Sequence, residues 1–265
     1  MTQFKIQNLS KSFGALQVIT KFDLELEKGD RHAIIGPNGA GKTTLFNMIT
    51  GWLAPDSGSM QIEGREIAGL PPQVINQAGL AQSFQKNTLF DGLSVGENLR
   101  LAVQGQQKAR FNIMRPASSF TSLWDRAFEV ARLVELEGAI EREVNTLSYG
   151  QKRQLEMGLA LACSPKILLL DEPAAGTSPG ERATIIRLLS DLPNDMTLLL
   201  VEHDMDVVFG VCDRITVLNY GRVVASGTPD QVRTNPEVRA TYLGHSESVT
   251  HNASADTDID KVESH

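Results

Sequence analysis

The fold is decided by one stretch, Gly36-Pro37-Asn38-Gly39-Ala40-Gly41-Lys42-Thr43, which is followed by Thr44. A short apolar run, His32–Ile35, predicts a strand directly before it, and a helical pattern begins at Lys42. Glycines let backbone N–H groups turn inward around phosphate oxygens, and the helix N-terminus adds its positive dipole. The Lys42 ammonium can reach β- and γ-phosphates, and the Thr43 hydroxyl can bind Mg²⁺. We therefore predict that this phosphate loop binds a nucleoside triphosphate. The alternative, a plain glycine-rich turn, would not account for the flanking strand and helix.

A second signal is a pair of carboxylates at the end of a predicted strand. Four apolar residues, Ile167–Leu170, are typical of a strand buried on both faces, and Asp171, Glu172 and Pro173 follow. Open α/β sheets bind their ligands at this end of the strands. Asp171 suits Mg²⁺, and Glu172 can act as a general base on an attacking water. Alternatively, the carboxylates merely end the strand, but the phosphate loop in the same chain favours the catalytic interpretation.

A third signal is the segment Leu147-Ser148-Tyr149-Gly150-Gln151. Ser148 followed by Gln151 fits a capping box, which predicts the start of a helix. A purely local cap is the interpretation that these residues favour by themselves. The alternative is a second anion-binding helix N-terminus in a chain with one phosphate-loop lysine. Such a site is explained if it serves a nucleotide bound to another subunit.

Strand and helix patterns alternate along the rest of the chain. Alternating apolar positions predict strands around Phe4 and Ile6 and again over Phe22–Leu26. Further strands are predicted over Ser59–Glu63, Ile167–Leu170, Thr197–Val201 and Ile215–Leu218, and helices over Val95–Val103, Leu123–Leu136 and Glu181–Leu189. This alternation predicts an α/β fold with a mainly parallel sheet, and the helices at about 90–160 read as an inserted helical subdomain.

Composition excludes several classes of protein. Apolar residues make up 41% and charged residues 22% of the 265 residues, which is ordinary globular usage. The net charge of −7 leaves no basic face for nucleic acid. The chain has neither an apolar run of membrane-spanning length nor a signal-peptide pattern, so we expect it not to span a membrane by itself. Cys163 and Cys212 are too far apart in the sequence for a CxxC metal site, so we predict that they are reduced thiols. The acidic stretch 245–265 predicts a disordered, solvated tail, with a regulatory role as the second option.

In their order and spacing, these motifs resemble the ATP-binding subunit of an ABC transporter over about residues 3–244. In that family, the signature turn (here residues 147–151) closes on ATP held by the phosphate loop of a partner subunit. Tyr149 replaces the first glycine of the signature pair, as in the branch that serves branched-chain amino-acid importers. The resemblance implies a P-loop NTPase core within an ATP-binding domain over 1–244, with an N-terminal antiparallel β subdomain and the inserted helical subdomain.

The resemblance also implies roles for single residues. Phe13 stands where the family places an aromatic ring on adenine, although a core phenylalanine is an equal alternative. Gln85 is similar to a loop glutamine that contacts Mg²⁺ or water and links to the membrane subunit, or it is a solvated amide. His203 resembles the switch histidine at the γ-phosphate, although a lone strand-end histidine is more often structural. Ala175–Pro179 corresponds to the dimer loop, in which Thr177-Ser178 departs from the usual Leu-Asn.

By resemblance, the chain is an ATPase that uses ATP and Mg²⁺ at the cytoplasmic face of the inner membrane. The implied partners are two permease subunits, an identical or homologous second ATPase subunit and, indirectly, a periplasmic solute-binding protein, with no nucleic acid. Glu172–Gly176, Glu202–Asp206 and the insertion Gln104–Leu123 resemble the hydrophobic amino-acid uptake branch, so branched-chain amino acids are the expected solutes.

Three alternatives remain. One is the ATPase subunit of an exporter or of a lipid or lipopolysaccharide transport system, which shares the phosphate loop and similar final strands. Another is a soluble ABC ATPase that works on ribosomes or DNA, which would normally carry two cassettes or heptad arms and basic surfaces. The third, a nucleotide-gated scaffold without hydrolysis, would be expected to lack Glu172 or His203, and both are present.

Overall fold

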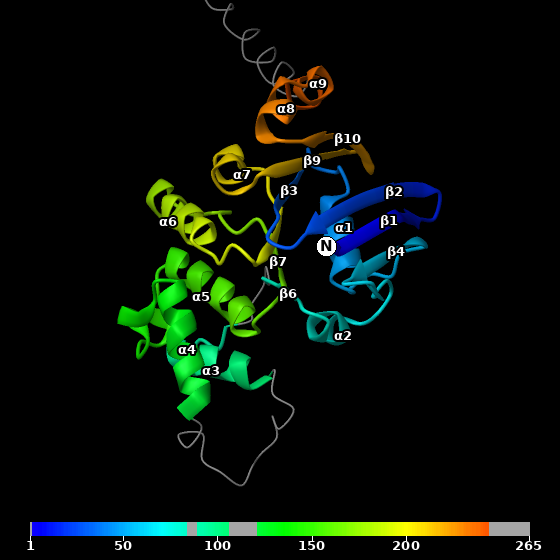
Figure 1. Cartoon of the computed structure of the whole chain (residues 1–265). Coiled ribbons are helices and arrows are strands. Elements are labelled where there is room, and N and C mark those ends of the chain that lie inside the picture. Colours follow the sequence, from blue (N-terminus) through cyan, green and yellow to red (C-terminus); the bar gives the residue numbers. More distant parts are fainter. Residues whose placement is uncertain (1, 84–88, 106–120, 244–265) are drawn as a thin grey trace, which may run out of the picture.

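The larger of two sheets carries the candidate site in the computed structural model, which describes residues 2–83, 89–105 and 121–243 (Figure 1). Among these residues the sheet has the strand order β10-β9-β3-β8-β7-β6. Its strands are β3 (Arg31–Ile35), β6 (Leu80–Gln82), β7 (Ile167–Asp171), β8 (Thr197–Val201), β9 (Arg214–Asn219) and β10 (Arg222–Gly227). Every neighbouring pair is parallel except the β9–β10 hairpin. The mainly parallel sheet is therefore confirmed.

The central strands are apolar on both faces, because the sheet is covered on both sides. In β7, Leu168 and Leu170 belong to one core cluster, whereas Ile167 and Leu169 belong to another. The same alternation holds in β3, where Ile34 faces the second cluster. Side chains alternate between the two faces of a strand, so a continuous apolar run is what burial on both faces requires.

A second, antiparallel sheet is built from the N-terminal part of the chain. Its order is β2-β1-β4-β5, with β1 (Thr2–Phe13), β2 (Leu16–Glu27), β4 (Ser57–Ile62) and β5 (Arg65–Glu66). Phe4 and Ile6 are buried in the same cluster as Leu169, so this sheet covers one face of the larger one. It is the antiparallel β subdomain that the resemblance implied.

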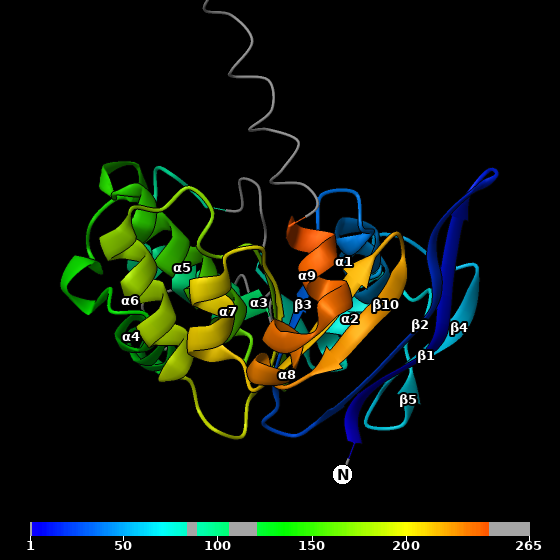
Figure 2. The ribbon, with the colours of Figure 1, turned by 90° about the horizontal axis from the view of Figure 1, so that it is seen from above.

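Helices make up the rest of the described fold. They are α1 (Lys42–Ile49), α2 (Pro72–Gln77), α3 (Val95–Gly105), α4 (Thr121–Leu133), α5 (Tyr149–Ala162), α6 (Pro179–Ser190), α7 (Met205–Val211), α8 (Pro229–Thr234) and α9 (Pro236–Leu243), with short 3₁₀ turns at Glu137–Ala139 and Val144–Thr146. Helices α3, α4 and α5 come between β6 and β7 in the chain and pack on one another. Figure 2 shows α4, α5 and α6 on one side of the molecule and the antiparallel sheet on the other. The helices inserted between two halves of the sheet are therefore confirmed.

Several elements escaped the sequence analysis. The strands β5 and β6 are two and three residues long, and α2 and α8 have six residues each, too few for a clear period. The helix α9 was also missed. Gln85, most of the insertion Gln104–Leu123 and the predicted tail 245–265 lie outside the described residues. Within the described ranges, no helix combines the length and apolarity needed to cross a bilayer.

We predict that Leu169→Ala lowers the free energy of unfolding by about 2–5 kcal/mol, because it leaves a cavity under a fully buried strand. Leu169 has an exposed fraction of 0%, whereas Leu16, the control, is 67% exposed. Urea unfolding followed by circular dichroism measures both. Leu16→Ala should change stability by no more than about 0.5 kcal/mol. A loss below about 1 kcal/mol for Leu169→Ala would contradict the two-sided core.

Candidate functional site

The phosphate loop leaves β3 and runs directly into α1. Its lysine is held inside the loop, since Lys42 Nζ donates to the Gly36 carbonyl at 2.6 Å and to the Pro37 carbonyl at 3.1 Å. Two glycines are sterically required. A Cβ at Gly36 would lie 2.2 Å from the Leu218 carbonyl oxygen, and Gly41 has φ +103° at the helix N-cap. The loop carbonyls therefore hold the lysine ammonium within the loop, and the tight glycine backbone is typical of a phosphate cradle.

Three ionisable groups meet beside this loop. Burial lowers the pKa of Lys42, and the Glu172 and Asp171 carboxylates oppose that shift. The carboxylates reach the lysine because β3, β8 and β7 are neighbouring parallel strands whose carboxyl ends share one edge. The structure therefore brings the first two sequence signals together.

Asp171 is a buried carboxylate, 8% exposed. Its pKa is raised to about 6, mainly by burial and then by the Glu172 and Glu202 carboxylates, while Lys42 acts in the opposite direction. Such a group gains from a cation that replaces the proton. Within the described residues, no group of three or more His, Cys, Asp or Glu side chains could hold a metal alone. Mg²⁺, however, is commonly bound by one or two protein oxygens together with substrate phosphates, so Asp171 and the exposed Thr43 fit that ion.

Glu172 and His203 face each other across the ends of β7 and β8. Glu172 Oε1 lies 3.2 Å from His203 Nδ1, and both side chains are partly open to solvent. Glu172 has φ +48° and precedes Pro173, a backbone conformation that costs a non-glycine residue about 1–3 kcal/mol. Strain of this kind clusters at functional sites. A carboxylate and an imidazole within hydrogen-bonding distance can pass one proton between them during general acid–base catalysis.

Glu202, which no sequence motif marked as functional, is buried directly after β8. Its Oε2 accepts from the backbone N–H of His203 at 2.8 Å and of Asp204 at 3.0 Å, and its Oε1 accepts from Ala174 at 3.4 Å. This carboxylate ties the loops after β7 and β8 together. A signal was present, because Glu202 follows an apolar strand in the same way that Asp171 does.

The signature turn begins α5 as predicted. Ser148 is its N-cap, with Gln151 N–H donating to Ser148 Oγ at 3.2 Å and the Gln151 side chain completing the capping box. Leu147 is buried in the core, whereas Tyr149 is 49% exposed. The Tyr149 hydroxyl donates to the Ala175 carbonyl of the dimer loop at 3.2 Å. The tyrosine that departs from the family's glycine thus links the two segments.

The two residues of the dimer loop that depart from the family pattern, Thr177 and Ser178, both form local hydrogen bonds. Thr177 is buried and its hydroxyl donates to the Ala174 carbonyl at 2.7 Å. Ser178 is the N-cap of α6 and forms a capping box with Glu181. Both residues therefore serve the local backbone.

Phe13 ends β1 and is 51% exposed, with Lys11 Nζ 5.8 Å from the centre of its ring. The alternative that Phe13 is a core residue is wrong, because half of its surface is exposed at the end of β1. Gln85 belongs to the range 84–88, outside the described residues, and its role stays a prediction.

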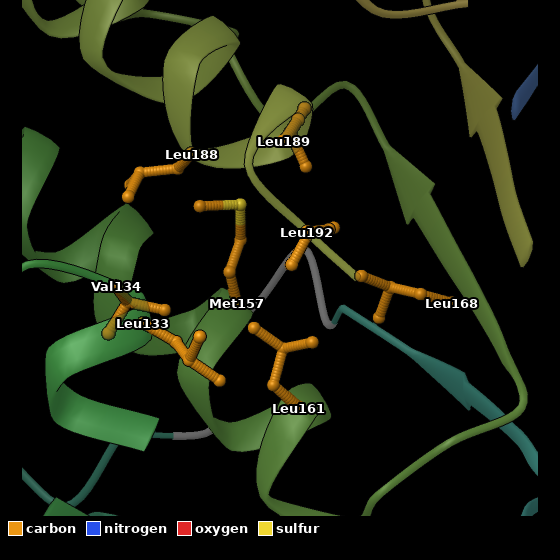
Figure 3. Close-up of a pocket in the computed structure, with 8 residues that line it drawn as sticks. All are labelled: Leu133, Val134, Met157, Leu161, Leu168, Leu188, Leu189 and Leu192. Carbon is orange, nitrogen blue, oxygen red and sulfur yellow. The ribbon is translucent and has the colours of Figure 1, made fainter. Parts of the chain in front are cut away.

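The pocket in Figure 3 is separate from these groups. It lies between α4, α5, α6 and β7 and is lined only by aliphatic and thioether side chains, namely Leu133, Val134, Met157, Leu161, Leu168, Leu188, Leu189 and Leu192. No polar atom of these side chains could orient a nucleotide. It is a packing gap where the helical subdomain meets the sheet.

Comparison with known proteins agrees with this geometry. The ABC transporter family model matches residues 19–175, and the model of branched-chain amino acid ATP-binding cassette transporters matches residues 222–248. The high-affinity branched-chain amino acid transport ATP-binding protein LivG of Escherichia coli is 39% identical, over 90% of this chain and 96% of that protein. BraF of Pseudomonas aeruginosa, with the same description, is 37% identical over 91% of this chain and 97% of that protein.

Solved structures agree as well. An ATP-binding cassette of an ABC transporter in its ADP conformation superposes with a TM-score of 0.80 at 29% identity, covering 92% of this chain and 99% of that one. A nucleotide-free cassette gives a TM-score of 0.79 at 27% identity, covering 91% and 99% of the two chains. The chain belongs to the ABC transporter family and has the fold of its ATP-binding cassette.

Proposed function

We propose that this chain is the ATP-hydrolysing subunit of an importer of branched-chain amino acids. The observation that carries hydrolysis is the approach of Glu172 Oε1 to His203 Nδ1 at 3.2 Å, beside the half-buried Lys42 of the phosphate loop. The solute class is supported by the likeness to LivG and BraF over more than 90% of their lengths.

Each group at the sheet edge has one task in this reaction. Backbone N–H groups of residues 36–44, of which Pro37 has none, and the Lys42 ammonium bind the β- and γ-phosphates, and Phe13 stacks on the adenine. Mg²⁺, when bound, neutralises phosphate charge; Thr43 and Asp171 are the described side chains that would hold it, with Gln85 as a third ligand. Glu172 accepts a proton from water while the water oxygen attacks the γ-phosphorus. The bond between the γ-phosphorus and the bridging oxygen breaks, and that oxygen leaves with ADP. His203 aligns the reacting groups through its contact with Glu172.

The remaining assignments concern partners. The signature turn, residues 147–151, would complete the site of a second ATPase subunit, identical or homologous. At the cytoplasmic face of the inner membrane, two permeases would be driven by the closure of the two ATPase subunits, and a periplasmic binding protein would deliver the solute. We place the ATP-binding domain at 1–244, its helical subdomain at about 90–160 and an acidic tail at 245–265.

Glu172→Gln should lower kcat for ATP hydrolysis by about 10²–10⁴-fold, because it removes the proton acceptor. ATP binding should persist, since the amide keeps the shape of the side chain and the phosphate loop is intact. Phosphate release and calorimetric ATP binding measure the two effects. Glu129→Gln, on an exposed position of α4, is the control. Turnover of Glu172→Gln above about a tenth of the parent rate would refute the role of Glu172.

Asp171→Asn should stabilise the chain at neutral pH when no nucleotide is present. The pKa of Asp171 is about 6 in the folded chain, above its ordinary value of 3.8, so the folded state holds this proton more tightly. The ionised carboxylate therefore destabilises the fold by roughly 3 kcal/mol above pH 6, and this penalty disappears as pH falls to about 4. Thermal melting should show Asp171→Asn several degrees more stable at pH 8 and equal to the parent near pH 4.

The metal-binding role of Asp171 is tested on the same variant. Asp171→Asn should lose most of the Mg²⁺ dependence of ATP binding. Unchanged Mg²⁺ dependence would contradict the metal-binding role of Asp171. A melting temperature equal to that of the parent at pH 8 would contradict its raised pKa.

Uptake by intact cells tests the transport function. Replacing the chromosomal copy by the Lys42→Ala variant should abolish high-affinity uptake of labelled leucine, isoleucine and valine, because the phosphate loop loses its cation. Uptake of an unrelated sugar is the control, and immunoblotting verifies equal protein levels. Undiminished uptake of all three amino acids would refute the proposed solute class.

A further inference from the structure

The carboxylate of Glu181 joins the signature turn to the dimer loop. Its Oε1 accepts from Gly150 N–H at 2.9 Å, and the Ser148 hydroxyl approaches the same oxygen at 3.5 Å. Its Oε2 accepts from the backbone N–H and from the hydroxyl of Ser178, both at 2.9 Å. The side chain therefore does more than cap its own helix.

The donors that face Oε1 favour an anion. They are a backbone N–H in the first turn of α5 and the hydroxyl of the N-cap residue, where the helix dipole is positive. Hydrogen bonds from the backbone and side chain of Ser178, and then from Gly150, lower the pKa of Glu181, so the group is ionised at neutral pH. A Cβ at Gly150 would lie 2.4 Å from Oε1, so a glycine is needed for this approach. An anion of the chain itself already occupies these donors.

The inference rests on the proposed function, in which Ser148 and Gly150 reach the γ-phosphate of ATP held by a partner subunit. Two anions that compete for the same donors repel each other and cannot both be satisfied. We propose that Glu181 is an internal competitor of that phosphate and sets how tightly the ATP-bound dimer closes. On closure the carboxylate leaves Gly150 and keeps its hydrogen bonds to Ser178. The contact of the Tyr149 hydroxyl with Ala175 keeps the two segments together.

A supporting role for Glu181 would have the opposite effect. If the carboxylate only held Gly150 N–H in place for the incoming phosphate, its removal would loosen the turn and weaken the dimer. If it competes, its removal frees the donors and strengthens the dimer. The sign of the change therefore separates the two roles.

The test measures dimer dissociation constants in a Glu172→Gln background, which we expect to hold ATP without turnover. Sedimentation in Mg-ATP should show that adding Glu181→Ala tightens the dimer about tenfold, the effect of one charge-assisted hydrogen bond that no longer has to be exchanged. Glu181→Gln, which keeps an acceptor without the charge, should tighten it about threefold. In Mg-ADP, which has no γ-phosphate, neither change should promote dimers.

The matched control is Ser178→Ala. It removes a capping hydroxyl that also donates to Glu181 Oε2, but it leaves the Ser178 backbone N–H and the Gly150 contact on the carboxylate, so the dimer constant should stay within about twofold. A gain equal to that of Glu181→Ala would mean that loosening α6 is sufficient and would overturn the proposal. A weakened or unchanged dimer in Glu181→Ala, or an equal gain in Mg-ADP, would also overturn it.

Two further results are decisive. Should Glu181→Ala fail to fold, Glu181→Gln decides alone, since an unchanged dimer constant refutes competition. A parent Glu172→Gln chain that stays monomeric in Mg-ATP would refute closure across a dimer, and the competition with it. A parent that dimerises without any gain from Glu181→Ala or Glu181→Gln would refute the competition only.

Discussion

The site depends on a geometric constraint: three neighbouring parallel strands end at the same edge of a sheet that is buried on both faces. Because β3, β8 and β7 run in one direction, the loops that follow them must emerge side by side. These loops carry Lys42, His203 and Glu172, and Lys42 is more than a hundred residues from the other two in the chain. The apolar runs that hold the strands in register therefore also set the distance between the phosphate cradle and the proton acceptor.

The two buried carboxylates at this edge, Glu202 and Asp171, have opposite surroundings. Glu202 accepts three backbone N–H groups, which satisfies its charge and fixes the loops after β7 and β8. Asp171 lies among other acids with its pKa raised to about 6, an unfavourable position for a folded chain without ligand. The first carboxylate stabilises the fold of the site. The second carries a local loss of stability that a bound cation would relieve, as is common where activity requires a strained arrangement.

Much of this could be predicted from sequence because the decisive features are local. The phosphate loop, the run Ile167–Leu170 and the cap at Ser148 each depend on neighbouring residues, and each lies where the pattern placed it. The roles of Glu202 and Glu181 could not be predicted in the same way. Their partners are backbone N–H groups at positions 174 and 150, and no spacing pattern encodes a contact between a side chain and a distant main chain. Very short elements such as β6 were missed because three residues show no period.

The departures of this chain from the family pattern lie on two sides of one interface. Tyr149, which stands in place of a glycine, reaches the Ala175 carbonyl, and a side chain at Gly176 would come within 3.3 Å of its hydroxyl. Across from it, Ser178 holds Glu181, whose other oxygen binds Gly150. A bulkier first signature residue is therefore accommodated by a dimer loop that stays small at 176. Since the Tyr149 phenol bridges the same two segments as the Glu181 carboxylate, a displacement of the signature turn that keeps the contact with Ala175 must also move the dimer loop, even when Glu181 leaves Gly150.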